Sequence, residues 1–214
     1  MEMIDSAFLM RFFRLAAERL EEARQYLCAL DGEVGDGDHG TSMANGFSAI
    51  TARLRVVAED DLPPDALLRE AAQAFLGEVG ATVGPLYASA MLTAAKRFAE
   101  TPPENRDLTM LLGGLVDGIS QCGKAGVGDK TMLDAWYPAV RAARAAVSRG
   151  ADFAATATAA TNAAQKGAEA TASMIASRGR AARLKERSLG HVDPGAASAA
   201  ILIGSFADLA RSGS

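Results

Sequence analysis

Apolar residues recur along this chain every three or four positions, which is the period of an α-helix. No convincing stretch alternates apolar and polar residues as a half-buried strand does. In the first run Phe8, Phe12 and Leu15 fall on one face, which predicts a helix over about residues 5–30 with Asp5 as its N-cap. The same spacing predicts further helices over about residues 41–58, 65–79, 85–99, 107–122, 131–148, 151–176 and 196–210.

Proline and glycine mark the breaks between the predicted helices. Pro64 suits the first turn of a helix, and Thr101–Asn105 is the clearest surface loop. No repeat, low-complexity tail or change in composition marks an internal boundary. The fold class predicted for residues 1–214 is therefore all-α, as a single-domain bundle of about eight helices.

Composition excludes several classes of protein. Hydrophobic residues make up 49% of the chain and charged residues 22%, as in ordinary soluble globular proteins. The formal net charge of −4 provides no basic surface for nucleic acid. No apolar run approaches the roughly 18–20 residues of a membrane span, and the N-terminus lacks the basic start of a signal peptide. These features predict a cytoplasmic protein that binds neither nucleic acid nor membrane.

Carboxylates are crowded into one glycine-rich stretch between the first two predicted helices, where Asp31, Glu33, Asp36 and Asp38 lie within eight residues. Without a counter-charge such groups repel one another, whereas a hard divalent cation takes carboxylate oxygens as its natural ligands. A standard EF-hand is excluded, because a pattern that starts at Asp36 puts Phe47 where the bidentate Glu belongs. The alternative to a metal site is a solvated acidic turn.

The acidic stretch runs directly into the second predicted helix. There His39, Gly40, Thr41 and Ser42 would present backbone N–H groups at a helix N-terminus, which is a ready site for an anion. Metal-binding acids beside a phosphate cradle indicate a metal–phosphate ligand. Magnesium fits best, because it commonly combines one or two carboxylates with substrate phosphates.

A second glycine-rich loop, Gly123–Thr131, almost has the pattern of a P-loop. Asp129 interrupts that pattern between Gly128 and Lys130, and no strand precedes the loop, so a Walker A site is rejected. Its three glycines still allow close approach to a nucleotide. A plain helix–helix connection is the alternative.

Two further stretches carry polar groups. The run from Arg178 to Arg187 is basic, and the planar fork of arginine suits phosphate, with a solvated helical face as the alternative. The stretch from His191 to Gly195 has the composition of a turn, in which a lone histidine is more often structural than catalytic. No Ser-His-Asp set or nucleophile elbow can be assembled, so acyl chemistry is unsupported.

Taken together, the four loops resemble one family, the L subunit of bacterial dihydroxyacetone kinase, which is the nucleotide-binding half of that kinase. The matching stretches occur in the order of the family and are spread over most of the chain. They are GDGDHGTSMANGF (35–47), VGPLY (83–87), GKAGVGDKTMLDAW (123–136) and SRGRAARLKERSLGHVDPGA (177–196).

The resemblance implies an antiparallel barrel of eight helices with the nucleotide site at one end. It implies that Asp31, Asp36 and Asp38 bind two Mg2+ ions. The family often has Asn where this chain has Ser42, and Ser where it has Val83, and each change can remove a polar contact. The positions implied to contact ADP or ATP are His39, Gly40, Thr41, Ser42, Thr82, Val83, Gly123, Met132, Arg180, Asp193, Pro194 and Gly195.

The resemblance also implies a division of labour. A separate K subunit holds a short ketose, such as dihydroxyacetone or erythrulose, and this chain supplies the phosphoryl donor, with Arg180 as the catalytic residue that stabilises charge. Some L subunits keep ADP that a phosphotransferase-system phosphocarrier recharges, whereas others exchange ATP. The alternative is a non-catalytic module that holds Mg-ADP and docks onto a transcription factor or sensor. A homodimer is left open.

Overall fold

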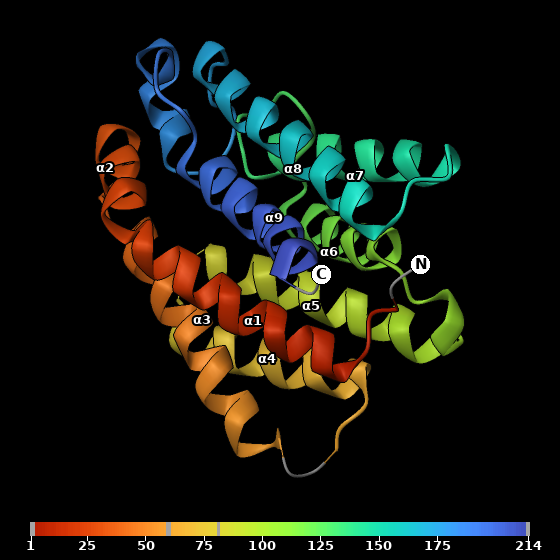
Figure 1. The fold of residues 1–214 in the computed structure, drawn as a ribbon. Coiled ribbons are helices and arrows are strands. Elements are labelled where there is room, and N and C mark those ends of the chain that lie inside the picture. Colours follow the sequence, from red (N-terminus) through yellow and green to blue (C-terminus); the bar gives the residue numbers. More distant parts are fainter. Residues whose placement is uncertain (1–2, 59–60, 81, 213–214) are drawn as a thin grey trace.

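Helices account for the secondary structure of the computed structural model, which describes residues 3–58, 61–80 and 82–212 and has no strand among them (Figure 1). The all-α class predicted from the sequence is confirmed. The α-helices are α1 (Ser6–Glu22), α2 (Arg24–Val34), α3 (His39–Val56), α4 (Pro64–Glu78), α5 (Val83–Glu100), α6 (Leu108–Gly123), α7 (Leu133–Ser148), α8 (Phe153–Ala170) and α9 (Pro194–Ser212). Short 3-10 helices lie in the connections, namely η2 (Pro103–Asn105), η3 (Thr171–Ser173) and η4 (Ala181–Ser188).

Among the described residues, eight of these helices close a ring. Helix α1 packs against α3, each helix from α3 to α8 packs against the next, and α9 returns to α1. Helices that follow one another around the ring run in opposite directions (Figure 1). The eight-helix antiparallel barrel is therefore confirmed, with α2 at one end of it against α3 and α9.

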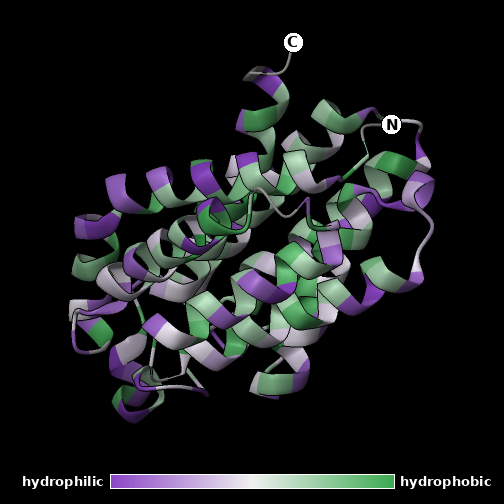
Figure 2. Ribbon diagram, turned by 90° about the horizontal axis from the view of Figure 1, so that it is seen from below, coloured by the Kyte–Doolittle hydropathy of each residue, from purple (hydrophilic) through white to green (hydrophobic). Residues whose placement is uncertain are grey.

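Large apolar side chains fill the inside of the barrel. The rings of Phe12 and Phe206 stack with their centroids 4.2 Å apart, and those of Phe47 and Phe75 meet edge to face at 5.6 Å. Trp136 belongs to the same cluster and is 1% exposed. Figure 2 shows the hydrophobic segments toward the middle of the molecule and the hydrophilic ones toward its outside. Because such a core is close-packed, it holds the ends of the helices in fixed positions.

Two helix ends follow the sequence signals. The Asp5 side chain accepts the N–H of Phe8 at 2.7 Å, which caps α1 as predicted. Pro64 occupies the first turn of α4, where its missing N–H costs nothing. No helix among the described residues is long and apolar enough to cross a bilayer.

Two predicted helices are wrong in their extent. The helix predicted over residues 5–30 is divided at Ala23, whose ψ of 0° redirects the chain so that α2 continues to Val34 at the end of the barrel. The helix predicted to reach residue 176 ends at Ala170. The next residue, Thr171, donates its hydroxyl to a carbonyl of α8 and accepts the N–H of Asp193, so it joins two connections instead of extending the helix.

Candidate functional site

Three carboxylates gather where α2 ends and α3 begins. One oxygen from each of Asp31, Asp36 and Asp38 lies within 4.8 Å of the others. Asp31 does not lie in a loop as predicted: it is in the last turn of α2 and is buried, whereas Asp36 and Asp38 are exposed in the short connection. Like charges at this spacing repel, so the cluster favours a divalent cation.

The connection between α2 and α3 depends on two glycines. A Cβ at Gly35 would lie 2.2 Å from Oδ1 of Asp31, so only glycine allows the carboxylate to lie against the backbone here. Gly37 has a φ of +79°, a conformation that glycine adopts without strain. The Asp31 carboxylate accepts the N–H groups of Asp38 at 3.0 Å and His39 at 3.2 Å. These bonds fix the orientation of Asp31 against the start of α3.

Four helices begin at the end of the barrel where the carboxylates lie. In an antiparallel ring every second helix starts at the same end, and α3, α5, α7 and α9 all place their first residues around one cavity. A helix N-terminus carries a partial positive charge and unpaired N–H groups, so it favours an anion. Two of the predicted N–H donors are already used inside the protein, since His39 donates to Asp31 and Ser42 to the carbonyl of Asp38.

The cavity at this end has a volume of about 280 Å³. It brings together every predicted site residue except Gly40 and Thr41. Gly40 is buried between helices, where a Cβ would lie 2.1 Å from the carbonyl oxygen of Arg24, and the Thr41 hydroxyl lies 3.6 Å from Sγ of Cys28. The predicted residues that line the cavity are Asp31, Asp36, Asp38, His39, Ser42, Thr82, Val83, Gly123, Met132, Arg180, Asp193, Pro194 and Gly195.

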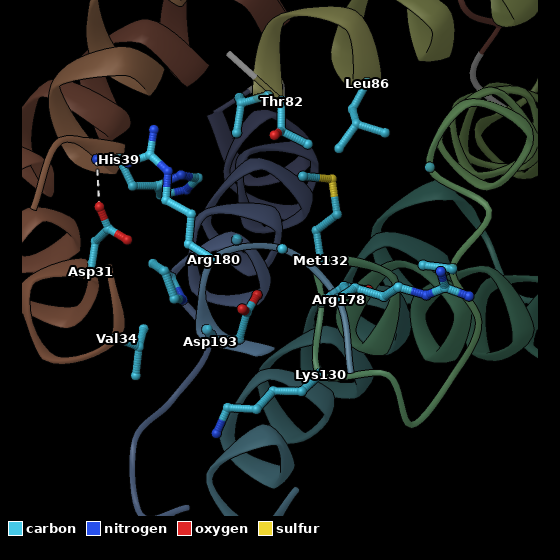
Figure 3. Close-up of a pocket in the computed structure, with 18 of the residues that line it drawn as sticks. Asp31, Val34, His39, Thr82, Leu86, Lys130, Met132, Arg178, Arg180 and Asp193 are labelled. Atoms are coloured by element: carbon cyan, nitrogen blue, oxygen red, sulfur yellow. Dashed lines mark hydrogen bonds between the residues drawn. The ribbon is translucent and has the colours of Figure 1, made fainter. Parts of the chain in front are cut away.

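One side of the cavity is apolar. Figure 3 shows Met132 and Leu86 on the side opposite Asp31 and His39. The resemblance implied Met132, but Leu86 was not predicted, because its side chain has the spacing of an ordinary core residue. One signal was present, since Leu86 follows Thr82 by one helical turn and so shares its face. Other lining residues that were not among the predicted site residues are Val34, Gly80, Ile119, Ala125, Lys130, Thr131, Leu133, Arg178, Gly179 and Ala181.

The basic segment places one guanidinium on the acidic cluster. Arg180 forms an ion pair with Asp36, and both side chains are about half exposed. Arg178 points elsewhere, with its Nε 3.7 Å from the carboxylate of Asp129. Arg183 and Arg187 are exposed and do not line the cavity. Of these arginines, Arg180 is therefore the one whose charge reaches the carboxylates.

Burial shifts two titratable groups beside the cluster. It lowers the pKa of His39 to about 4, although the charge of Asp31 opposes the shift, so the imidazole is neutral at pH 7. Nε2 of His39 lies 2.9 Å from the Ser198 hydroxyl, which itself donates to Gly195. Burial also raises the pKa of Asp193 to about 7, while the N–H of Ala196 and the charge of Lys130 lower it. Asp193 is thus poised to respond to charge brought into the cavity.

An all-helical barrel with an acidic cluster beside a cavity ringed by helix N-termini defines a recognisable class. The profile of the family described as DAK2 domain matches residues 33–208. That range contains most of the barrel and all of the residues that line the cavity except Asp31.

Relatives with curated names cover nearly the whole chain. The ADP-binding subunit DhaL of PEP-dependent dihydroxyacetone kinase 2 from Listeria innocua is 35% identical over 204 residues, which are 94% of this chain and 93% of the relative. The DhaL subunit of the Escherichia coli PEP-dependent dihydroxyacetone kinase is 37% identical over 175 residues, covering 81% of this chain and 82% of the relative. The chain belongs to the DhaL family of DAK2-domain proteins.

A solved structure shares the fold. The native form of the dihydroxyacetone kinase of C. freundii superposes with a TM-score of 0.73 at 26% identity. The match covers 95% of this chain but only 34% of that kinase. This chain therefore corresponds to about a third of the longer protein.

Proposed function

We propose that this chain is the ADP- or ATP-binding subunit of a dihydroxyacetone-type ketose kinase. The observation that carries the proposal is the charge pattern of the cavity, in which three clustered carboxylates lie beside four helix N-termini. Carboxylates suit a divalent cation and helix N-termini suit phosphate, so a magnesium nucleotide satisfies both. The names of the two relatives support ADP as the resident nucleotide.

The two sides of the cavity suggest how the nucleotide lies. Its phosphates belong beside Asp31, Asp36 and Asp38, where the metal would be, and near the start of α3. Its base belongs against the apolar wall that includes Met132 and Leu86. Ligand pockets commonly combine an apolar lining with a few fixed polar groups.

We propose that the three aspartates hold two Mg2+ ions. Asp31 is oriented by the amides of Asp38 and His39, which prepares it as a ligand before any ion arrives. The ions would neutralise the phosphates during transfer, because phosphoryl transfer depends mainly on positioning and charge stabilisation. His39, neutral at pH 7, adds no competing positive charge to the cluster.

Arg180 is proposed as the catalytic residue. In this structure its guanidinium is held by Asp36 at the edge of the cluster. With Asp36 bound to metal, that guanidinium would be free to bind the β- and transferred phosphoryl groups. A planar guanidinium offers paired N–H donors to phosphate oxygens, which suits this role better than an ammonium.

The ketose is proposed to be held by a partner K subunit, and the phosphoryl donor to be recharged by a phosphocarrier. The described residues contain two histidines that could bind the carbonyl of a ketose, and both lie at the nucleotide end of the barrel. His39 is buried, and Nδ1 of His191 lies 3.7 Å from the carboxylate of Glu33. We infer that residues 1–214 act as one domain, which forms a complex with the K subunit.

Three measurements test the proposal. Mass analysis of the purified protein should find ADP or ATP, and calorimetry should show Mg-ADP binding that Asp36→Asn weakens strongly. Glu33→Gln is the matched control, because Glu33 lies in the same stretch but outside the carboxylate cluster. With a K subunit the parent should phosphorylate dihydroxyacetone, and alone it should not. Tight Mg-ADP binding without turnover in the complex would instead support the regulatory module.

A further inference from the structure

A lysine is buried beside the cavity. The side chain of Lys130 is 1% exposed, and its backbone is in the left-handed region with a φ of 59°. Its ammonium donates to four backbone carbonyls, those of Thr171 at 2.9 Å, Met174 at 3.2 Å, Ser188 at 2.6 Å and His191 at 2.6 Å. An ammonium has three N–H donors, so two of the carbonyls share one of them.

These carbonyls belong to one stretch of chain, residues 171–191, here called the arginine segment. Two of them precede Arg180 and two follow it, so a single ammonium ties together both ends of the segment. The segment has little regular structure of its own, apart from the 3-10 helices η3 and η4. Its ends are also joined by a bond of its own, since the N–H of Gly190 donates to the carbonyl of Ala172 at 2.8 Å, and the ammonium adds four more bonds from outside the segment.

Asp129 makes a second set of bonds to the same segment. Its Oδ1 accepts the hydroxyl of Ser177 at 2.6 Å, and its backbone carbonyl accepts the Ser177 N–H at 3.2 Å. Its other oxygen accepts the N–H of Gly126 at 2.8 Å and lies 3.7 Å from Nε of Arg178. Asp129 thus joins the glycine-rich loop to the segment on the outside, while Lys130 joins them on the inside.

The direction of Lys130 excludes a phosphate-binding role in this structure. Figure 3 shows its ammonium pointing away from Arg180 and Met132. Four carbonyls surround it, so a phosphate would have to displace them. A buried ammonium is costly unless it is fully hydrogen-bonded, and here the bonds are all to the segment that carries Arg180.

We propose that Lys130, assisted by Asp129, is the positioning residue for Arg180. The proposal rests on the proposed function, because it assigns Lys130 to the placement of the arginine that meets the phosphates. Without the ammonium, the ends of the arginine segment keep only bonds such as that from the Gly190 N–H to the Ala172 carbonyl, and the backbone that carries Arg180 is held less firmly over the carboxylates. A misplaced group near the reacting atoms slows the chemical step strongly.

The test is a double-mutant cycle in the complex with a K subunit. Lys130→Met should lower kcat on the order of tenfold or more, with a smaller effect on the affinity for Mg-ADP. In an Arg180→Ala background Lys130→Met should have no further effect on kcat, because it acts through the missing side chain. Effects that multiply would overturn the proposal. Lys166→Met, which removes an exposed lysine from α8, is the matched control and should match the parent.

Hydrogen exchange provides a readout that needs no turnover. The amides of Ser177 and Gly190 bond to the carbonyls of Asp129 and Ala172, so Lys130→Met should speed their exchange while the barrel helices keep theirs. Unchanged exchange in the arginine segment would overturn the proposal even if the parent complex proved inactive. If Lys130→Met does not fold, Asp129→Ala takes its place in the same cycle, and multiplicative effects there overturn the proposal equally.

Discussion

Replacing Gly40 with alanine should destabilise the fold, and not merely weaken ligand binding. Gly40 is buried in the first turn of α3, where this helix packs on α2. A Cβ there would lie 2.1 Å from the carbonyl oxygen of Arg24 and 2.9 Å from the amide nitrogen of Cys28. Both atoms belong to the backbone of α2, so neither can rotate away, and the two helices would have to separate.

The size of the effect follows from that separation. Non-bonded heavy atoms settle at about 3.5 Å, so the helices must move apart on the order of 1 Å. Overpacking typically costs about 1–3 kcal/mol, and a clash with backbone places Gly40→Ala at the upper end of that range. In a chain of this length each kcal/mol moves Tm by about 2–4 °C. We therefore expect a decrease in Tm of about 6–12 °C.

Thermal unfolding followed by circular dichroism measures this decrease. Gly77→Ala is the matched control, because Gly77 is exposed in α4 and an added Cβ meets no described atom within 4 Å. Alanine favours a helix over glycine by up to about 1 kcal/mol, so the control should raise Tm slightly. A Gly40→Ala protein that melts at or above the parent temperature would refute the packing argument and return Gly40 to its predicted role as a nucleotide contact.

Three further predictions concern the cavity. Asp36→Asn should weaken Mg-ADP binding in calorimetry by about tenfold or more while helical circular dichroism is unchanged, because Asp36 is exposed. Arg180→Lys should still slow turnover of the reconstituted complex, since it keeps the charge but loses the planar fork, and parent-level kinetics would contradict this. Asp193→Asn should alter the pH dependence of unfolding in metal-free protein. Burial raises the pKa of Asp193 to about 7, so between about pH 4 and 7 the folded state keeps a proton that the unfolded state releases. The parent loses stability from this group as pH rises through that window, and urea unfolding should show the variant gaining on the parent.

The barrel could be predicted because burial of one helical face imposes a period on the sequence. Phe8 and Phe12 repeat at that period and lie buried in α1. The acidic cluster could be predicted for a different reason. Asp31, Asp36 and Asp38 lie within eight residues, so any fold keeps their carboxylates near one another, and such crowding favours a cation.

The break at Ala23 could not be predicted. Alanine is a strong helix former, and no glycine or proline marks the site. The bend instead brings α2 against α3 and α9, so its cause is tertiary packing. Leu86 was missed for a related reason: a side chain that lines a cavity near the end of a helix has the same spacing as one that fills the core.

The chemical type of a residue also led to a wrong expectation where the direction in which the residue faces determines its role. Lys130 follows three glycines in a loop that was predicted to allow close approach to a nucleotide, but its positive φ turns its side chain toward the carbonyls of the arginine segment. Gly40 sits among the predicted phosphate contacts, but its lack of a side chain serves the contact between α2 and α3. A linear pattern identifies the groups near a site, and the backbone path determines which of them face it.

The charges around the cavity set a condition on its ligand. The carboxylates of Asp31, Asp36 and Asp38 oppose any bare anion, and the N-termini of four helices oppose any bare cation. In this structure the guanidinium of Arg180 neutralises part of the carboxylate charge by pairing with Asp36. A metal ion bound to phosphates suits both kinds of charge, because the cation can bind the carboxylates while the phosphate oxygens face the helix N-termini. The site therefore favours the metal–nucleotide complex over either component alone, and we propose that binding of that complex frees Arg180 for the phosphates.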